Sequence, residues 1–135
     1  MNQPLPYQTS GRVIHGAGRG RTLGFPTANL DVALPANLAL GIYAGWATVN
    51  HSTNHRPALI YWGKRPTFDE RVAVCEVLLF NETETVDLYD SVLQIDLVAH
   101  LRPDQRFHSP RELMTQIQAD MTQAATVLGV PPRTG

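Results

Sequence analysis

"RVAVCEVLLF", residues 71–80, is the most apolar stretch of the chain, and the fold class depends on it. Its β-branched and other apolar residues predict a strand, in which successive side chains point to opposite faces. One face carries Val72, Val74, Glu76, Leu78 and Phe80, and the other carries Ala73, Cys75, Val77 and Leu79. Both faces are apolar, and Glu76 is the only charge within the strand proper.

Further strand candidates lie on both sides of this segment, at residues 11–16, 41–50, 57–63 and 91–101. Turns or loops are expected between them, at residues 16–20, 51–56, 64–70 and 81–90, and residues 24–40 are expected to be irregular. Five strands separated by turn signals favour an all-β fold, either an antiparallel sandwich or a barrel.

One helix is expected after the last strand. Ser109 is suited to the N-cap, Pro110 to the first helical position, and Glu112 completes a capping box. Apolar residues then recur at helical spacing, at Leu113, Ile117, Met121, Ala124 and Leu128. Gly129 and Pro131 predict the end of the helix. The apolar stripe is expected to pack on the sheet.

Length and composition fit one globular domain spanning residues 1–135, with flexible tails expected at residues 1–10 and 130–135. The net charge of -1 argues against a duplex nucleic-acid partner. Cys75 is the only cysteine, which excludes an internal disulfide and a cysteine-rich zinc site. The sequence lacks a signal peptide pattern and any apolar stretch of membrane-spanning length, so we expect a cytoplasmic monomer.

Glu76 is the first candidate for chemistry. Burying an unpaired carboxylate is unfavourable, so this side chain is expected either to pair with an arginine or to point into a cleft. In a cleft, it could serve as a general base.

The segment "GFPTANLD", residues 24–31, is the second candidate. Pro26 restricts the backbone, and Thr27 and Asn29 point to the same side if the chain is extended. Their neutral oxygens are suited to a hard cation such as Mg²⁺, which takes its other ligands from water and phosphate. Alternatively, both side chains satisfy backbone groups of a loop.

Two further segments could bind ligands. The turn "GAGRGR", residues 16–21, matches neither the Walker nor the dinucleotide motif, but its glycines would let backbone amides approach an anion. The alternative is a tight turn with solvated arginines. The segment "LRPDQRF", residues 101–107, could bind a flat ring with an anionic tail, or could be a connecting loop. Trp46, Trp62, Tyr43 and Tyr61 are expected in the core or on sheet faces.

Together these segments resemble the riboflavin kinase family, either as a stand-alone kinase or as the kinase domain of a bifunctional riboflavin kinase/FAD synthetase. The resemblance runs from about Leu5 to Leu128 and rests on "GRVIHGAGRGRTLGFPTANL", "LALGIYAGWATV", "GKRPTF", "CEVLLF", "VDLYD" and "LRPDQRFHSPRELMTQIQAD". It implies a six-stranded antiparallel Greek-key β-barrel with a C-terminal helix, one strand more than the residue patterns predict.

The resemblance also implies transfer of the γ-phosphoryl group of ATP to the 5′-hydroxyl of riboflavin, giving FMN and ADP. Glu76 would be the base, and Thr27 and Asn29 would bind Mg²⁺ and phosphate. The nucleotide phosphates would also be held by Gly16, Gly18, Arg19 and Arg21. The flavin would be bound by Arg102, Phe107 and Leu113.

Three positions depart from the family pattern. Tyr61 stands where many members have asparagine, Leu78 where many have histidine, and Asp90 where glycine is usual. Tyr61 and Leu78 correspond to positions beside the family's active site. They leave open an alternative function as a non-catalytic flavin- or nucleotide-binding module on the same barrel.

Overall fold

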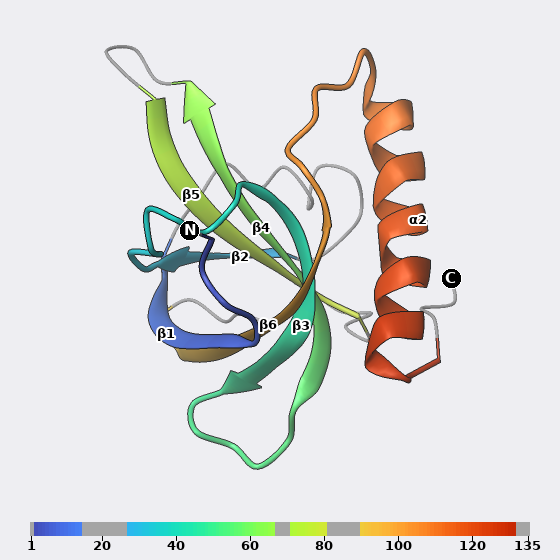
Figure 1. Ribbon diagram of the computed structural model, residues 1–135. Helices are drawn as coiled ribbons and strands as arrows, with labels where there is room; N and C mark the ends of the chain where they lie inside the picture. Colours follow the sequence, from blue (N-terminus) through green and yellow to red (C-terminus); the bar gives the residue numbers. More distant parts are fainter. Residues whose placement is uncertain (1, 15–26, 67–70, 81–89, 132–135) are drawn as a thin grey trace.

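The computed structural model describes residues 2–14, 27–66, 71–80 and 90–131. These residues form six strands and one helix (Figure 1). In chain order the elements are β1 (Tyr7–Ile14), β2 (Thr27–Asp31), β3 (Gly41–Val49), β4 (Arg56–Pro66), β5 (Arg71–Leu79), β6 (Val92–Arg102) and α2 (Pro110–Leu128).

The strands form a closed barrel in the order β1-β2-β5-β4-β3-β6, and every pair is antiparallel. Strands β3, β4 and β5 are consecutive neighbours, and β6 returns to lie beside β3. This arrangement is a Greek key. The expected six-stranded antiparallel Greek-key barrel with a C-terminal helix is therefore confirmed.

The sixth strand, β2, lies inside the segment that was expected to be irregular. Thr27–Asp31 pairs with β1 on one side and with β5 on the other. Ala28 and Leu30 point into the barrel and are buried, while Thr27 and Asn29 share the opposite face. The prediction of an irregular segment was wrong for residues 27–31, because pairing on both edges holds this part of the chain extended, which the short, proline-flanked sequence does not reveal.

Two other boundaries differ from expectation. Strand β1 begins at Tyr7 because residues 7–12 pair with β6, so the flexible tail expected at residues 1–10 is too long. Strand β4 continues to Pro66, into the expected loop at residues 64–70, because it pairs with β5 along this length. The turn expected at residues 16–20 lies outside the described residues. The loop expected at residues 81–90 also lies outside them, except for Asp90.

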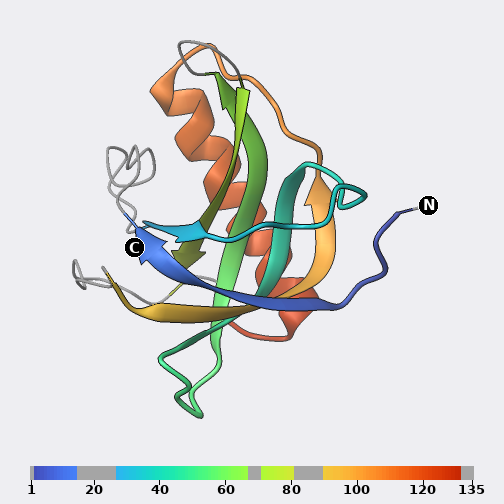
Figure 2. The ribbon, with the colours of Figure 1, turned by 90° about the vertical axis from the view of Figure 1, so that its left-hand side faces the viewer.

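The barrel has two apolar cores. The first fills its interior and includes Leu30, Ile60, Cys75, Val77, Leu79 and Ile95. The second lies outside the barrel wall, beneath α2, and includes Ile42, Ala44, Leu59, Leu78, Phe80, Met121 and Ala124. The two predicted faces of β5 therefore enter different cores. The predicted stripe of α2 packs on β3, β4 and β6 (Figure 1 and Figure 2).

The helix begins and ends at the predicted residues. The Ser109 hydroxyl accepts a hydrogen bond from the Glu112 amide at 3.1 Å, while the Glu112 carboxylate accepts one from the His108 amide at 3.0 Å. Gly129 has a φ of 71°, which favours glycine at the end of a helix. The amide of Val130 donates to Ala125 O and its side chain packs on the second core, so Val130 is not part of a flexible tail.

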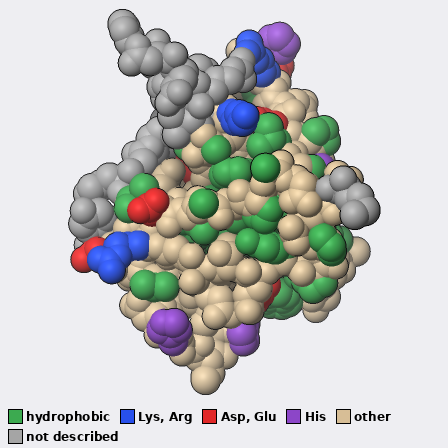
Figure 3. Space-filling model, turned by 60° about the vertical axis from the view of Figure 1, so that its left-hand side comes forward, with side chains coloured by type: hydrophobic (Ala, Val, Ile, Leu, Met, Phe, Trp, Pro, Cys, Tyr) green, Lys and Arg blue, Asp and Glu red, His purple; other side chains and the backbone are tan. Residues whose placement is uncertain are grey.

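On the face drawn in Figure 3, the described Lys and Arg side chains lie in separate places rather than in one patch. No helix among the described residues has both the length and the apolar character needed to cross a membrane.

A buried ion pair joins α2 to the barrel. The guanidinium group of Arg102, at the end of β6, donates to both carboxylate oxygens of Asp120 at 2.8–3.0 Å. The Asp120 side chain is only 1% exposed and also accepts a hydrogen bond from Gln116 Nε2 at 2.9 Å. Breaking a buried pair leaves the remaining charge uncompensated.

We expect Asp120→Ala to lower the free energy of unfolding by about 3–5 kcal/mol, because Arg102 would keep its buried charge without a carboxylate. Denaturation in urea measures the change. Gln118→Ala, at an exposed position of the same helix, is the control and should stay within about 0.5 kcal/mol of the unaltered protein. Equal stability of the two variants would contradict a structural role for the pair.

Cys75 provides a second prediction. Burial, and to a lesser extent the nearby charge of Glu76, raises the pKa of its thiol to about 12. Because the thiolate is the reactive form, the folded protein should not react with Ellman's reagent at pH 8. After unfolding in guanidinium the same sample should release one equivalent of chromophore. Rapid reaction of the folded protein would show that this part of β5 is not buried as described.

Candidate active site

The register of the barrel aligns the candidate residues in one row. Asn29 lies opposite Glu76, and Glu76 lies opposite Tyr61. The row continues through Ile42 to Arg102. Because directly paired residues of antiparallel strands share a face, the row lies on the outer face of the barrel, which α2 covers in part. The row brings together residues from five strands that are far apart in the sequence.

A second row lies beside the first. Thr27 is paired with Leu78, and Leu78 with Leu59. The row thus passes from a hydroxyl on β2 to the apolar side chains of β5 and β4. Both rows begin with a polar residue on β2; the second continues with leucines, whereas the first also carries Glu76 and Arg102.

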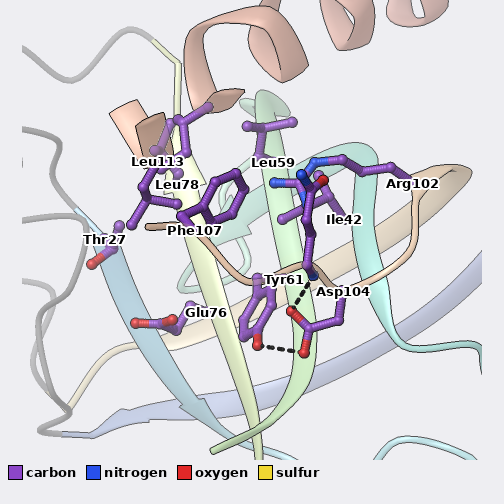
Figure 4. A pocket seen from close by; sticks show the side chains of 12 residues that line it. Thr27, Ile42, Leu59, Tyr61, Glu76, Leu78, Arg102, Asp104, Phe107 and Leu113 are labelled. Atoms are coloured by element: carbon purple, nitrogen blue, oxygen red, sulfur yellow. Dashed lines mark hydrogen bonds between the residues drawn. The ribbon is translucent and has the colours of Figure 1, made fainter. Parts of the chain in front are cut away.

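A pocket lies over these rows (Figure 4). The strands supply its floor, and the β6–α2 loop (residues 103–109) and the first turns of α2 supply the other wall. Its lining residues are Thr27, Ile42, Leu59, Tyr61, Glu76, Leu78, Arg102, Asp104, Gln105, Phe107, Leu113 and Ile117. Half of these side chains are apolar, and the other half carry polar groups, a combination typical of small-molecule sites.

Thr27 and Glu76 form the polar end of the pocket (Figure 4). Glu76 is 7% exposed and lines the pocket, as expected if its carboxylate points into a cleft. The Thr27 hydroxyl is buried and has no hydrogen-bond partner among the described residues. Buried polar atoms without partners are rare, and an atom of this kind at the wall of a pocket is suited to bind a ligand.

Arg102 lies at the opposite end (Figure 4). Its guanidinium group is bound to Asp120 and stands 5.5 Å from the centre of the Phe107 ring. It also donates to Pro103 O at 3.3 Å. Arg102 therefore contributes a charge that Asp120 already balances, and it holds the loop that carries Phe107.

Of the predicted site residues that the structure describes, all but one line the pocket. Thr27, Glu76, Arg102, Phe107 and Leu113 all line the pocket. Asn29 stands next to them in the register, opposite Glu76, without lining the pocket itself. The four residues predicted in the glycine-rich turn lie outside the described residues: Gly16, Gly18, Arg19 and Arg21.

The roles of several polar residues were not predicted. Tyr61 lies on a sheet face beside the site, as expected, but its hydrogen bond to Asp104, at 3.0 Å, was not foreseen. Asp104 lies within the loop segment that was expected to bind a ring, but no sequence pattern distinguished it from its neighbours in that loop. Asp120 lies on the helix face of the apolar stripe, and this break in the stripe was the signal that could have revealed it.

Comparison with known proteins shows the family to which the chain belongs. The sequence model of the riboflavin kinase family matches residues 3–128. Human riboflavin kinase is 35% identical over 94% of this chain and 84% of the human protein. The bifunctional riboflavin kinase/FMN adenylyltransferase of Escherichia coli is 35% identical over 93% of this chain and 39% of that protein.

A solved structure, riboflavin kinase from Trypanosoma brucei, has a TM-score of 0.66 to this barrel. It is 24% identical over 93% of this chain and 82% of that chain, so it supports the fold alone. The family match and the human relative cover almost the whole length described here. The chain belongs to the riboflavin kinase family.

Proposed function

We propose that the chain transfers the γ-phosphoryl group of ATP to the 5′-hydroxyl of riboflavin, producing FMN and ADP. The observation that carries the proposal is the placement of Glu76 and the Thr27 hydroxyl together at one end of a pocket whose wall also carries a cluster of apolar side chains. Membership in the riboflavin kinase family supports the same reaction.

The pocket accounts for both parts of riboflavin. The planar ring would lie between the barrel wall and α2, against apolar side chains that include Leu59, Leu78, Phe107 and Leu113. Arg102 would contribute to this side by fixing the Phe107 ring. The polar ribityl chain would extend toward the other end of the pocket, and its terminal hydroxyl would reach Glu76.

Glu76 would act as the general base. Its carboxylate would accept the proton of the 5′-hydroxyl as that oxygen forms a bond to the γ-phosphorus of ATP. The bond between the γ-phosphorus and the bridging oxygen would break, and ADP would leave with the electron pair. Phosphoryl transfer depends mainly on alignment and charge stabilisation, so one well-placed carboxylate is sufficient.

The residues of β2 fit a Mg²⁺ ion. Thr27 and Asn29 stand on one face of the strand and supply neutral oxygens, and the Thr27 hydroxyl has no partner among the described residues. We propose that these two residues hold Mg²⁺ and the phosphates of ATP. A bound Mg²⁺ would neutralise part of the phosphate charge. Gly16, Gly18, Arg19 and Arg21 are proposed to bind the phosphates from the sequence pattern alone.

The alternative function, a non-catalytic flavin- or nucleotide-binding module, is not favoured. Tyr61 and Leu78 motivated it, and both line the pocket. However, Glu76 and Thr27 are both present in the same pocket. A module that only binds its ligand would not need to retain both residues. We further propose that the chain acts as a cytoplasmic monomer on small-molecule substrates and that it binds neither nucleic acid nor a membrane.

The proposal is tested by incubating the protein with riboflavin, ATP and Mg²⁺ and separating the flavins by chromatography. We expect FMN to form and to depend on all three components. Folded protein that yields no FMN above background would overturn the proposed function. Flavin fluorescence quenching without ATP turnover would instead support the binding module.

We expect Glu76→Gln to lower kcat by about 100-fold or more, because the amide cannot accept the hydroxyl proton. Riboflavin binding, measured by fluorescence quenching, should change little because the two side chains have the same shape. Asp96→Asn is the matched control. Its carboxylate accepts a hydrogen bond from Gln8 at 2.7 Å, outside the pocket, and its activity should be normal. A near-normal rate for Glu76→Gln would exclude Glu76 as the base.

Thr27→Val should separate binding from stability. Without ligands, the free energy of unfolding should stay the same or rise by about 1 kcal/mol, since the variant removes a buried hydroxyl that makes no described hydrogen bond. The KM for Mg–ATP should rise about tenfold.

The matched control for stability is Thr48→Val. Thr48 is also buried, but its hydroxyl lies 3.0 Å from His55 Nδ1, so the free energy of unfolding of this variant, measured by denaturation in urea as for Thr27→Val, should fall by about 1 kcal/mol. If Thr27→Val is the more destabilising of the two, the Thr27 hydroxyl has a structural role and its assignment to the metal fails.

A further inference from the structure

Tyr61 connects the floor of the pocket to the loop that forms its opposite wall. Its hydroxyl, on β4, donates to Asp104 Oδ2 at 3.0 Å across the pocket (Figure 4). The other carboxylate oxygen, Oδ1, accepts a hydrogen bond from the Gln105 amide at 2.9 Å. Asp104 thus links the tyrosine directly to the backbone of the β6–α2 loop.

Gly63 leaves the space in which this contact forms. It lies two residues beyond Tyr61 on β4, so the two positions share a face. A Cβ at position 63 would lie 2.1 Å from the Tyr61 hydroxyl oxygen and 3.0 Å from Asp104 Oδ2. Both partners of the hydrogen bond therefore occupy the volume that any other residue at this position would fill.

The loop is fixed at three described points. Near β6, the Arg102 guanidinium group donates to Pro103 O and stands over the Phe107 ring. Near α2, the His108 amide donates to Glu112. The Tyr61–Asp104 hydrogen bond fixes the loop to the barrel wall on the other side of the pocket. This contact sets the distance between the floor of the pocket and the loop that carries Phe107.

We propose that Tyr61 is a positioning residue for the flavin substrate, and that it acts through Asp104. Its hydrogen bond holds the β6–α2 loop at the spacing that a planar ring requires between the barrel and Phe107. The proposal rests on the proposed function, since the ring is that of riboflavin. It also gives a role to a tyrosine that departs from the asparagine common in the family.

The test is a comparison of Tyr61→Phe with the unaltered protein. The variant keeps the ring and removes only the hydroxyl, so the KM for riboflavin should rise about three- to tenfold. The kcat and the KM for ATP should stay within about twofold, because Glu76 and Thr27 are unchanged. Tyr7→Phe, a tyrosine on β1 outside the pocket, is the matched control and should show no change.

Two further variants separate this role from a general loss of packing. Asp104→Ala should raise the KM for riboflavin as Tyr61→Phe does, and the double variant should be no worse than either single one. Gly63→Ala should raise it as well, because the added methyl group displaces the tyrosine hydroxyl.

An unchanged KM for riboflavin in Tyr61→Phe, or additive effects in the double variant, would overturn the positioning role while leaving the proposed function intact. A fall in kcat that exceeds the change in KM would also overturn it. If the unaltered protein forms no FMN, the proposed function and the inference both fail. Whether the unaltered protein forms FMN therefore distinguishes failure of the positioning role alone from failure of the proposed function.

Discussion

The pairing of β5 with β2 on one edge and β4 on the other is the constraint on which the site depends. It places Asn29, Glu76 and Tyr61 in one row and Thr27 beside them. A slip of one residue in either pair would send these side chains to the opposite face of the sheet. The apolar interior prevents such a slip, because Ala28, Leu30, Cys75 and Val77 would then leave the core.

The position of Glu76 follows from the two-sided burial of β5. A barrel wall open to water on the outside would need polar residues at every second position. In this chain α2 and its loop cover part of the outer face, so that face is apolar around Glu76. Because α2 and its loop cover this face, the residues around Glu76 are apolar, and its charge is conspicuous in the sequence. The same covering also forms the pocket that Glu76 lines.

Local patterns in the sequence predicted the parts of the molecule that depend on local contacts. The limits of α2 were correct because capping and the terminal glycine act within a few residues. Strand β2 was missed because its extended form depends on partners that are distant in the chain. Glu76 could be predicted as a site residue because it is a single charge in an apolar strand. The roles of Tyr61 and Asp104 depend on a contact between distant parts of the chain, which no local pattern shows.

The location of α2 at the end of the described fold has a consequence for how the site assembles. The interior core draws on the strands alone, while the pocket wall also needs the β6–α2 loop and the helix. Because β1 pairs with β6, the barrel cannot close during synthesis until β6 has left the ribosome. Docking of α2 through Arg102 and Asp120 would come after closure, so the domain would become able to bind its ligand only after its barrel has formed.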